Sequence, residues 1–446
     1  MSLPAIFQIN TYRISSKVTL LMALWLASSC LSTLIGDNPW PAMVRWFEIL
    51  TNCLIGLCLY LLIHNKPELK PLVIKAVIAA LLLCVIVFVL FWHLSPAPEQ
   101  HNWTSDIPFF LNIRHFSYLA AAALPFGYWL LENNEYKNRI AVVILYLSIC
   151  WGLIFWLGGR AAFLGVITAT FIYFILSRTH IKSVLLSILI GLLLSQLFIA
   201  ESANLNMFRL FDLFLNSESK DLNNHSSFRM KIYLESIQYW WQEVPFLGIG
   251  ADGYRYITPA IAGLDNITHP HSIFIQLLLS FGIPGAIIPM YLFLLLTYSI
   301  FKKQANLTIT EKILYLPILS SIVSGMFNGI FYHAYGLFIS TIILAICIPS
   351  YTGYNRQVHS NTISSKKVPS IITLLTLITG LYYLIFSAQL YASKIGCTDK
   401  NWINWNAKYP LYFSPNGSYS RYSEDDIEDF KKSYYRNYQN RNCIAK

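Results

Sequence analysis

Long apolar runs alternate with short polar segments through most of the chain. A helix needs about 20 apolar residues to cross a bilayer. By that measure the pattern predicts an all-α polytopic membrane protein with about eleven transmembrane helices, within a range of about ten to twelve. The predicted helices cover residues 18–35, 44–63, 72–92, 114–131, 140–157, 161–177, 183–199, 271–300, 312–328, 331–348 and 369–388. The first run has no clear cleavage site for a signal peptidase, so we expect it to remain as a helix.

Two long polar segments divide this pattern into four sections. N-terminal helices (1–199) are followed by a large loop (200–270), C-terminal helices (271–388) and a polar tail (389–446). Positive side chains gather in alternate short loops, for example at Lys66, Lys137 and Arg178, and such loops stay on the inner side of a membrane. The N-terminus is therefore predicted inside, with the large loop and the tail outside.

The large loop contains a predicted amphipathic helix from Ser226 to Gln242, with Ser226 or Ser227 as its N-cap. Pro245 ends it, and a glycine-rich turn over residues 248–253 leads back to the next helix. Apolar side chains recur along the helix at helical spacing, and they suit a membrane interface. They are Met230, Tyr233, Ile237, Trp240 and Trp241.

Composition agrees with a membrane protein. Only 12% of the residues are charged and 55% are hydrophobic, whereas a soluble domain has about 25% charged residues. The net charge of +10 is spread over short loops, so we expect no nucleic-acid partner. In the tail, Cys397 and Cys443 could pair if the outer compartment is oxidising.

The first candidate functional residues are His269 and His271, at the outer mouth of the segment 271–300. Imidazole has an unperturbed pKa near neutrality and can act as a general base. The alternative is a pair of interfacial polar residues without chemistry. No Cys, Asp or Glu stands beside them at metal-binding spacing, so no metal is expected. Gly282, Pro284 and Gly285 follow and predict a break or kink in the helix.

Three arginines are further candidates. Arg160 lies in a tight Gly158-Gly159-Arg160 turn on the outer edge, where a planar guanidinium suits a phosphate or diphosphate. The alternative for Arg160 is contact with lipid head groups. Arg229 lies on the amphipathic helix, and its alternative is a surface ion pair with Glu235 or a contact with lipid head groups. Arg114, followed by His115, is a similar case at the start of the fourth helix.

These residues together resemble a known family. The run His271-Ser272, nine residues, Gly282-x-x-Gly285 is similar to the motif of bacterial O-antigen ligases. The segment from Trp240 to Gly250, the Gly-Gly-Arg turn and the arginine at 229 also resemble that superfamily. Ala286 departs from the pattern, which prefers Gly, Thr or Tyr at this position.

The resemblance implies an inner-membrane, multi-pass glycosyltransferase with its active site facing the periplasm and no cofactor. The implied donor is a glycan on undecaprenyl diphosphate, and the implied acceptor is a hydroxyl of lipid A-core. His271 and Arg229 are implied as catalytic residues, with Arg160, Arg114 and His269 binding the diphosphate or substrate. Membrane lipids are the remaining expected partners.

Three rivals stay open at this point. The superfamily also includes O-antigen polymerases and O-linked protein oligosaccharyltransferases, which differ in the acceptor. A non-enzymatic transporter of lipid-linked glycans would instead be expected to carry polar or charged groups near mid-membrane.

Overall fold

The computed structural model describes residues 16–36, 39–94, 113–198, 229–254, 257, 269–302 and 307–351. Every regular element in these segments is helical, which confirms the predicted all-α class for this part of the chain. The predicted helix 369–388, the tail after 389 with both of its cysteines, and the predicted N-caps Ser226 and Ser227 lie outside the described residues.

The described elements follow the predicted order of apolar runs. They are α2 (Ser16–Ile35), α3 (Pro39–Asn65), α4 (Leu69–Leu94), α5 (Ile113–Ala123), α6 (Pro125–Glu132), the 3₁₀ helix η3 (Asn134–Arg139), α7 (Ile140–Leu157), α8 (Arg160–Leu176), α9 (Ile181–Leu194), the 3₁₀ helix η4 (Ser195–Phe198), α12 (Arg229–Glu243), α14 (Ile273–Lys302), α15 (Ile309–Ile313), α16 (Leu316–Gly325) and α17 (Ala334–Tyr351).

Four stretches in the described part are both long and apolar enough to cross a membrane. They are Arg45–Asn65, Leu69–Phe91, Asn134–Leu157 and Ile273–Tyr298. The other apolar helices, among them α8, α9 and α17, are shorter. The total of about eleven spans and their orientation therefore remain predictions.

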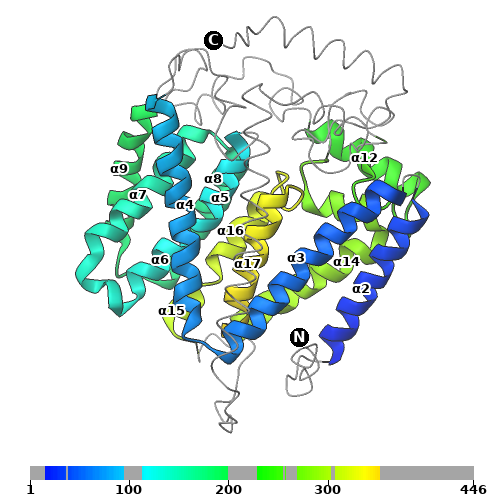
Figure 1. Cartoon of the computed structure of the whole chain (residues 1–446), viewed down its shortest axis with the longest axis horizontal. Helices are drawn as coiled ribbons and strands as arrows, with labels where there is room; N and C mark the ends of the chain where they lie inside the picture. The colour runs from blue at the N-terminus through cyan, green and yellow to red at the C-terminus, as the bar shows by residue number, and fades with distance from the viewer. Residues whose placement is uncertain are drawn as a thin grey trace, which may run out of the picture.

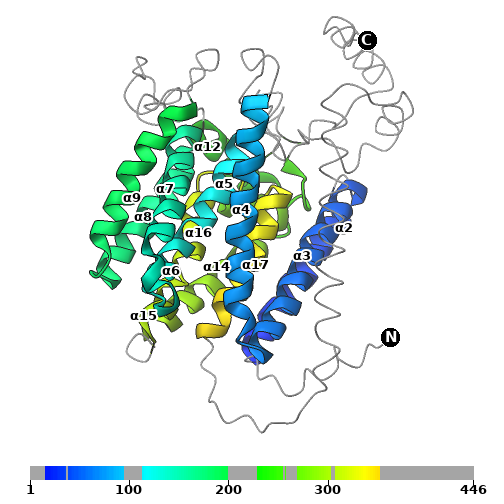
Figure 2. The same cartoon turned by 60° about the vertical axis from the view of Figure 1, so that its left-hand side comes forward.

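The helices form two groups joined by a central pair. α7, α8 and α9 lie together on one side of the molecule, and α2 and α3 lie side by side on the other (Figures 1 and 2). α16 and α17 lie between them: α16 contacts α5 and α8, whereas α17 contacts α3 and α5. The main buried cluster fills the space among α4 to α8 and the central pair, with Trp151 and Trp156 among its largest side chains.

A proline divides the segment predicted as one helix over 114–131. Pro125 has no N–H, so the carbonyl of Ala121 loses its partner in the helix. The hydroxyl of Ser320 on α16 donates to that carbonyl at 2.9 Å. A buried polar group is thereby satisfied from a neighbouring helix, as a membrane interior requires.

The predicted break in segment 271–300 is present in α14 at Gly282, where φ is 65° and ψ is −159°. Pro284 cannot donate to the carbonyl of Ser280, and the N–H of Ile283 donates to Pro245 instead of Leu279. Two carbonyls of the helix are thus left for other donors.

The glycine-rich turn after α12 supplies those donors. The N–H of Ile249 donates to Leu279 at 2.8 Å, and the N–H of Gly250 donates to Ser280 at 2.9 Å. The hydroxyl of Ser32 on α2 also donates to Ser280, at 2.7 Å. The break in α14 is therefore a docking point that ties the large loop and the N-terminal helices to the C-terminal half.

The predictions for 312–328 and 331–348 are wrong in their boundaries. The first segment is divided into the short helices α15 and α16, and α16 ends at Gly325. Residues 326–333 form turns, so His333 precedes α17 rather than lying inside a helix. Gly325 permits this turn because a Cβ there would meet the ring of Phe331.

Substitution of Gly282 by alanine should destabilise the folded protein. A non-glycine residue at a positive φ costs about 1–3 kcal/mol, and the added Cβ would also overlap the carbonyl of Phe246. We expect a lower thermal unfolding midpoint in detergent and less protein in the membrane. The control is Ile287→Ala on the exposed face of the same helix. Equal midpoints for the two variants would contradict the role assigned to Gly282.

Candidate functional site

The two histidines predicted from the sequence lie on the short segment that enters α14. The backbone at His271 is left-handed, with φ of 56°, which is uncommon for a residue other than glycine. The hydroxyl of Tyr233 on α12 donates to the carbonyl of His271 at 3.1 Å. The ring of His269 lies 4.2 Å from the ring of His271, centre to centre. The loop helix thus holds the histidine pair at the start of α14.

The Gly158-Gly159-Arg160 turn is built for close packing. Gly158 ends α7 with φ of 65°, and Arg160 is the first residue of α8. A Cβ on Gly159 would lie 2.7 Å from the hydroxyl oxygen of Ser117 on α5, so only glycine fits without a shift. That hydroxyl donates to the carbonyl of Arg114 at 2.7 Å. The turn therefore brings Arg160 and Arg114 together from two helices.

Arg229 is the first residue of α12 and is partly buried. The sequence left open an ion pair between Arg229 and Glu235, but Glu235 pairs with Lys231 at 3.7 Å. Burial lowers the pKa of Arg229, and the charges of Arg114 and Arg160 lower it further, while Tyr233 acts in the opposite direction. The three guanidinium groups therefore feel one another's charge.

The apolar side chains of α12 lie on two sides of the helix, one buried and one exposed. Ile232 is buried and Trp240 is half-buried in a small cluster that includes Ile275 and Leu279 of α14. The side chains of Met230, Leu234, Ile237, Trp241 and Phe246 are exposed. The buried side docks α12 onto α14 and so carries Arg229 and Tyr233 to the histidines.

Arg114, Arg160 and Arg229 all stand in the first turn of a helix: α5, α8 and α12 respectively. The amino end of a helix already carries about half a positive charge, so a cation there is unfavourable unless an anion is bound. The charges of Arg229 and Arg114 reach His271: together with burial, which has the largest effect, they lower its pKa to about 3. The arrangement can bind an anion beside a neutral imidazole.

Two histidines that the sequence analysis did not place in the site complete a cluster of four. His333 lies 5.0 Å from His269 and 3.9 Å from His115, measured between ring centres. Burial, followed by the neighbouring histidines and arginines, lowers the pKa of His269 well below its ordinary value. His333 stands between two apolar runs just as His269 and His271 do, and that signal could have identified it.

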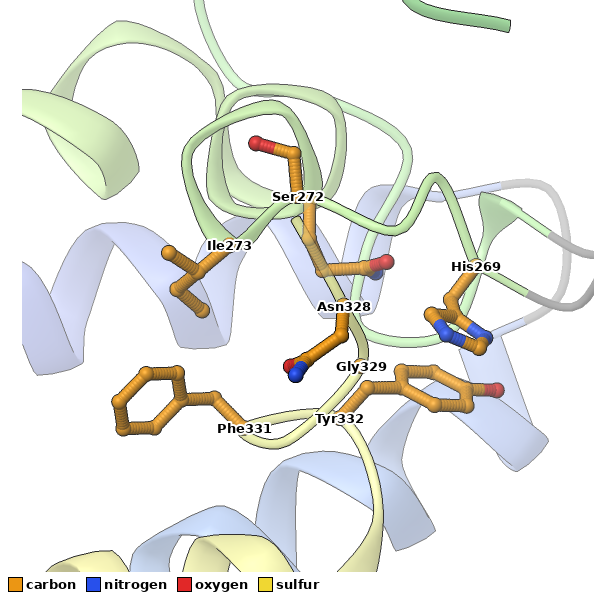
Figure 3. A pocket seen from close by; sticks show the side chains of 8 residues that line it. His269, Ser272, Ile273, Asn328, Gly329, Phe331 and Tyr332 are labelled. Carbon is orange, nitrogen blue, oxygen red and sulfur yellow. The ribbon is translucent and has the colours of Figure 1, made fainter. Parts of the chain in front are cut away.

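A small cavity of about 10 Å³ adjoins the cluster. The rings of His269 and Tyr332 lie face to face at one wall, with the amide of Asn328 at the centre and Phe331 beyond it (Figure 3). Binding pockets for drug-sized molecules have about 300–1,000 Å³. This cavity therefore suits a small polar group rather than a whole glycan.

Within the described residues, no group of three or more His, Cys, Asp or Glu side chains is arranged to hold a metal ion. The four histidines contact one another mainly through their rings. The charges in this part of the site come from arginine.

Fold and site together define a helical membrane protein with a cationic site that contains histidine. A family model described as O-antigen ligase matches residues 144–290. The matched segment includes Arg160, Arg229, His271 and the glycines at 282 and 285, and it confirms the resemblance to the O-antigen ligase superfamily. The family supports a glycan-transfer function and a membrane location. A comparison with curated proteins found no match.

The half-buried imidazole of His271 should make the protein less stable in acid. An ordinary histidine has a pKa of about 6.5. As the pKa of His271 is lowered to about 3, the unfolded chain binds a proton between these values that the folded protein excludes. Stability is therefore greatest above the ordinary pKa and falls as the pH drops below it. Replacement by glutamine should reduce the difference in unfolding midpoint between about pH 7 and about pH 5.

The measurement is thermal unfolding in detergent at the two pH values. His180→Gln, at the start of α9 and outside the cluster, serves as the control and should keep the wild-type difference. A His271→Gln protein with an unchanged pH response would show that this imidazole is not buried as described.

Proposed function

We propose that the protein transfers a glycan from undecaprenyl diphosphate to a hydroxyl of lipid A-core, at the periplasmic face of the bacterial inner membrane. The observation that carries the proposal is a group of three arginines in the first turns of three helices, whose charges act on one another and, for Arg229 and Arg114, on a neutral histidine. A diphosphate carries more than one negative charge, and its oxygens can accept paired hydrogen bonds from the planar fork of a guanidinium, so this arrangement suits it.

In the proposed reaction the acceptor hydroxyl attacks the anomeric carbon of the donor sugar. The bond from that carbon to the acceptor oxygen forms as its bond to the diphosphate oxygen breaks, so the anomeric configuration inverts. His271 accepts the hydroxyl proton, and the lipid diphosphate leaves with the bonding electron pair. His269 is assigned a supporting place beside His271.

The arginines have two roles in this scheme. Arg114, Arg160 and Arg229 hold the diphosphate and stabilise the charge that grows on it as the bond breaks. The bound diphosphate also offsets the positive charge that Arg229 and Arg114 impose on His271, so the imidazole becomes a stronger base once the donor is present. Donor binding would thereby prepare the base for the acceptor.

The histidine assignment is tested by His271→Ala in a strain that lacks the chromosomal copy. Removing a general base costs about 10²–10⁴ in rate, so long-chain lipopolysaccharide should disappear while lipid-linked polymer accumulates. The amount of protein in the membrane should stay close to that of the wild type. A normal lipopolysaccharide ladder in this strain would remove His271 from the mechanism.

The same deletion strain separates the possible acceptors. Products with a single repeat would indicate a polymerase. Intact lipopolysaccharide with an unmodified secreted glycoprotein would indicate a protein oligosaccharyltransferase. Either product pattern would overturn the ligase assignment.

Arg160→Lys tests the diphosphate clamp. Lysine keeps the charge but loses the planar fork, so transfer should fall by about tenfold or more. The control is Arg139→Lys, which changes an arginine in η3, outside the site. Transfer at the wild-type rate by Arg160→Lys would indicate that Arg160 serves only as a head-group contact.

A further inference from the structure

We infer that Tyr332 is a positioning residue for the histidine pair: Arg45 and Asp252 hold Tyr332, and the ring of Tyr332 holds the imidazole of His269 beside His271. The inference rests on the proposed function, because it names a residue on which the geometry of that site depends. It draws on three segments that carry none of the predicted site residues: α3, the turn over residues 248–253 and the turns before α17.

The contact between Tyr332 and His269 is an aligned stack. Their ring centres are 4.8 Å apart and their planes differ by 11°. Such a pair constrains the tilt of the imidazole as well as its place. Gly329 closes the space on another side, because a Cβ there would overlap Nε2 of His269. His269 is thus confined by the turn between α16 and α17.

Tyr332 is itself held at three points. Its hydroxyl donates to Oδ1 of Asp252 at 2.5 Å. The guanidinium of Arg45 donates to its backbone carbonyl, and the central carbon of that guanidinium lies 5.0 Å from the centre of its ring. Asp252 is buried and has a left-handed backbone with φ of 64°, in the same turn that docks into the break of α14. Arg45 is paired with Glu48 on α3.

The consequence for His271 follows from the ring contacts. His269 lies 4.2 Å from His271 and packs edge-on against His333. If the ring of Tyr332 tilts, His269 loses one wall, and the imidazole of His271 loses the neighbour that limits its own orientation. A misplacement of about 1 Å at a reacting group can cost about a hundredfold in rate.

The test measures glycan transfer by the purified full-length protein in liposomes. The donor is undecaprenyl-diphosphate-linked glycan and the acceptor is lipid A-core. Tyr332→Phe keeps the stacked ring but loses the bond to Asp252, and we expect kcat to fall by about tenfold to a hundredfold with little change in the KM for the donor. Asp252→Ala should behave alike, whereas Asp252→Asn keeps an acceptor oxygen and should restore most of kcat.

A double variant and a matched control separate positioning from general damage. Tyr332→Phe combined with Asp252→Ala should be no slower than either single variant, because both remove the same bond. Tyr128→Phe is the control, since Tyr128 also stacks on a ring and also bonds through its hydroxyl, to Thr170 at 2.7 Å. Tyr128 lies in the core on α6, where it contacts the C-terminal half of α8, and its replacement should leave kcat unchanged.

Three results would overturn the inference: a wild-type kcat for Tyr332→Phe, an equal loss in Tyr128→Phe, or losses that multiply in the double variant. Failure of the proposed function is seen separately, as transfer by His271→Ala at the wild-type rate. Loss of transfer in His271→Ala together with a wild-type Tyr332→Phe would reject only the role of Tyr332.

Discussion

The structure depends on the backbone hydrogen bonds across the break in α14. A helix that contains Gly282 and Pro284 leaves carbonyls without intrahelical partners, and in a membrane such groups cannot be left to water. The N–H groups of Ile249 and Gly250, together with the hydroxyl of Ser32, satisfy them. One set of bonds therefore joins the N-terminal helices, the large loop and the C-terminal half. Gly282, one of the glycines that resemble a family motif, acts here through the backbone, by allowing the segment at Phe246 to approach.

The same docking places the charges. With its C-terminal turn anchored in α14, helix α12 brings Arg229 and Tyr233 to the histidines, while the Gly-Gly turn brings Arg160 to Arg114. Three guanidinium groups at helix amino termini repel one another and destabilise the empty site. This repulsion lowers the stability of the folded protein, and a bound anion would relieve it. The buried histidines add to this cost in acid, because their neutral forms are the ones that the fold accepts.

Much of this organisation could be predicted from sequence, and the errors have physical causes. Hydrophobic runs located the helices, since burial of apolar residues sets their length and place, and the break at Gly282 was foreseen from glycine and proline chemistry. The predicted helix boundaries were wrong at Pro125 and at residues 326–333. Near Pro125 the hydroxyl of Ser320 on α16 satisfies the carbonyl that the proline leaves without a partner. Near residues 326–333 the ring of Phe331 packs against Gly325. The sequence predicted an amphipathic helix here but not which apolar side chains would be buried: Ile232 is buried in the fold, whereas Met230 is exposed. Periodicity gives the spacing of side chains but does not say which stripe meets a partner.

The sequence by itself determined the helical class and the positions of the apolar runs, and it supplied the candidate site residues, because these follow from local composition and spacing. Tertiary structure alone decided that the charges of Arg114 and Arg229 act on the imidazole of His271 and that Arg160 acts on Arg229. It also decided that His333 and Tyr332 pack against His269, and that His115 packs against His333. These residues are separated by tens to hundreds of positions along the chain. Which of them meet depends on how helices pack, and helix packing is set by many side chains at once rather than by any one motif.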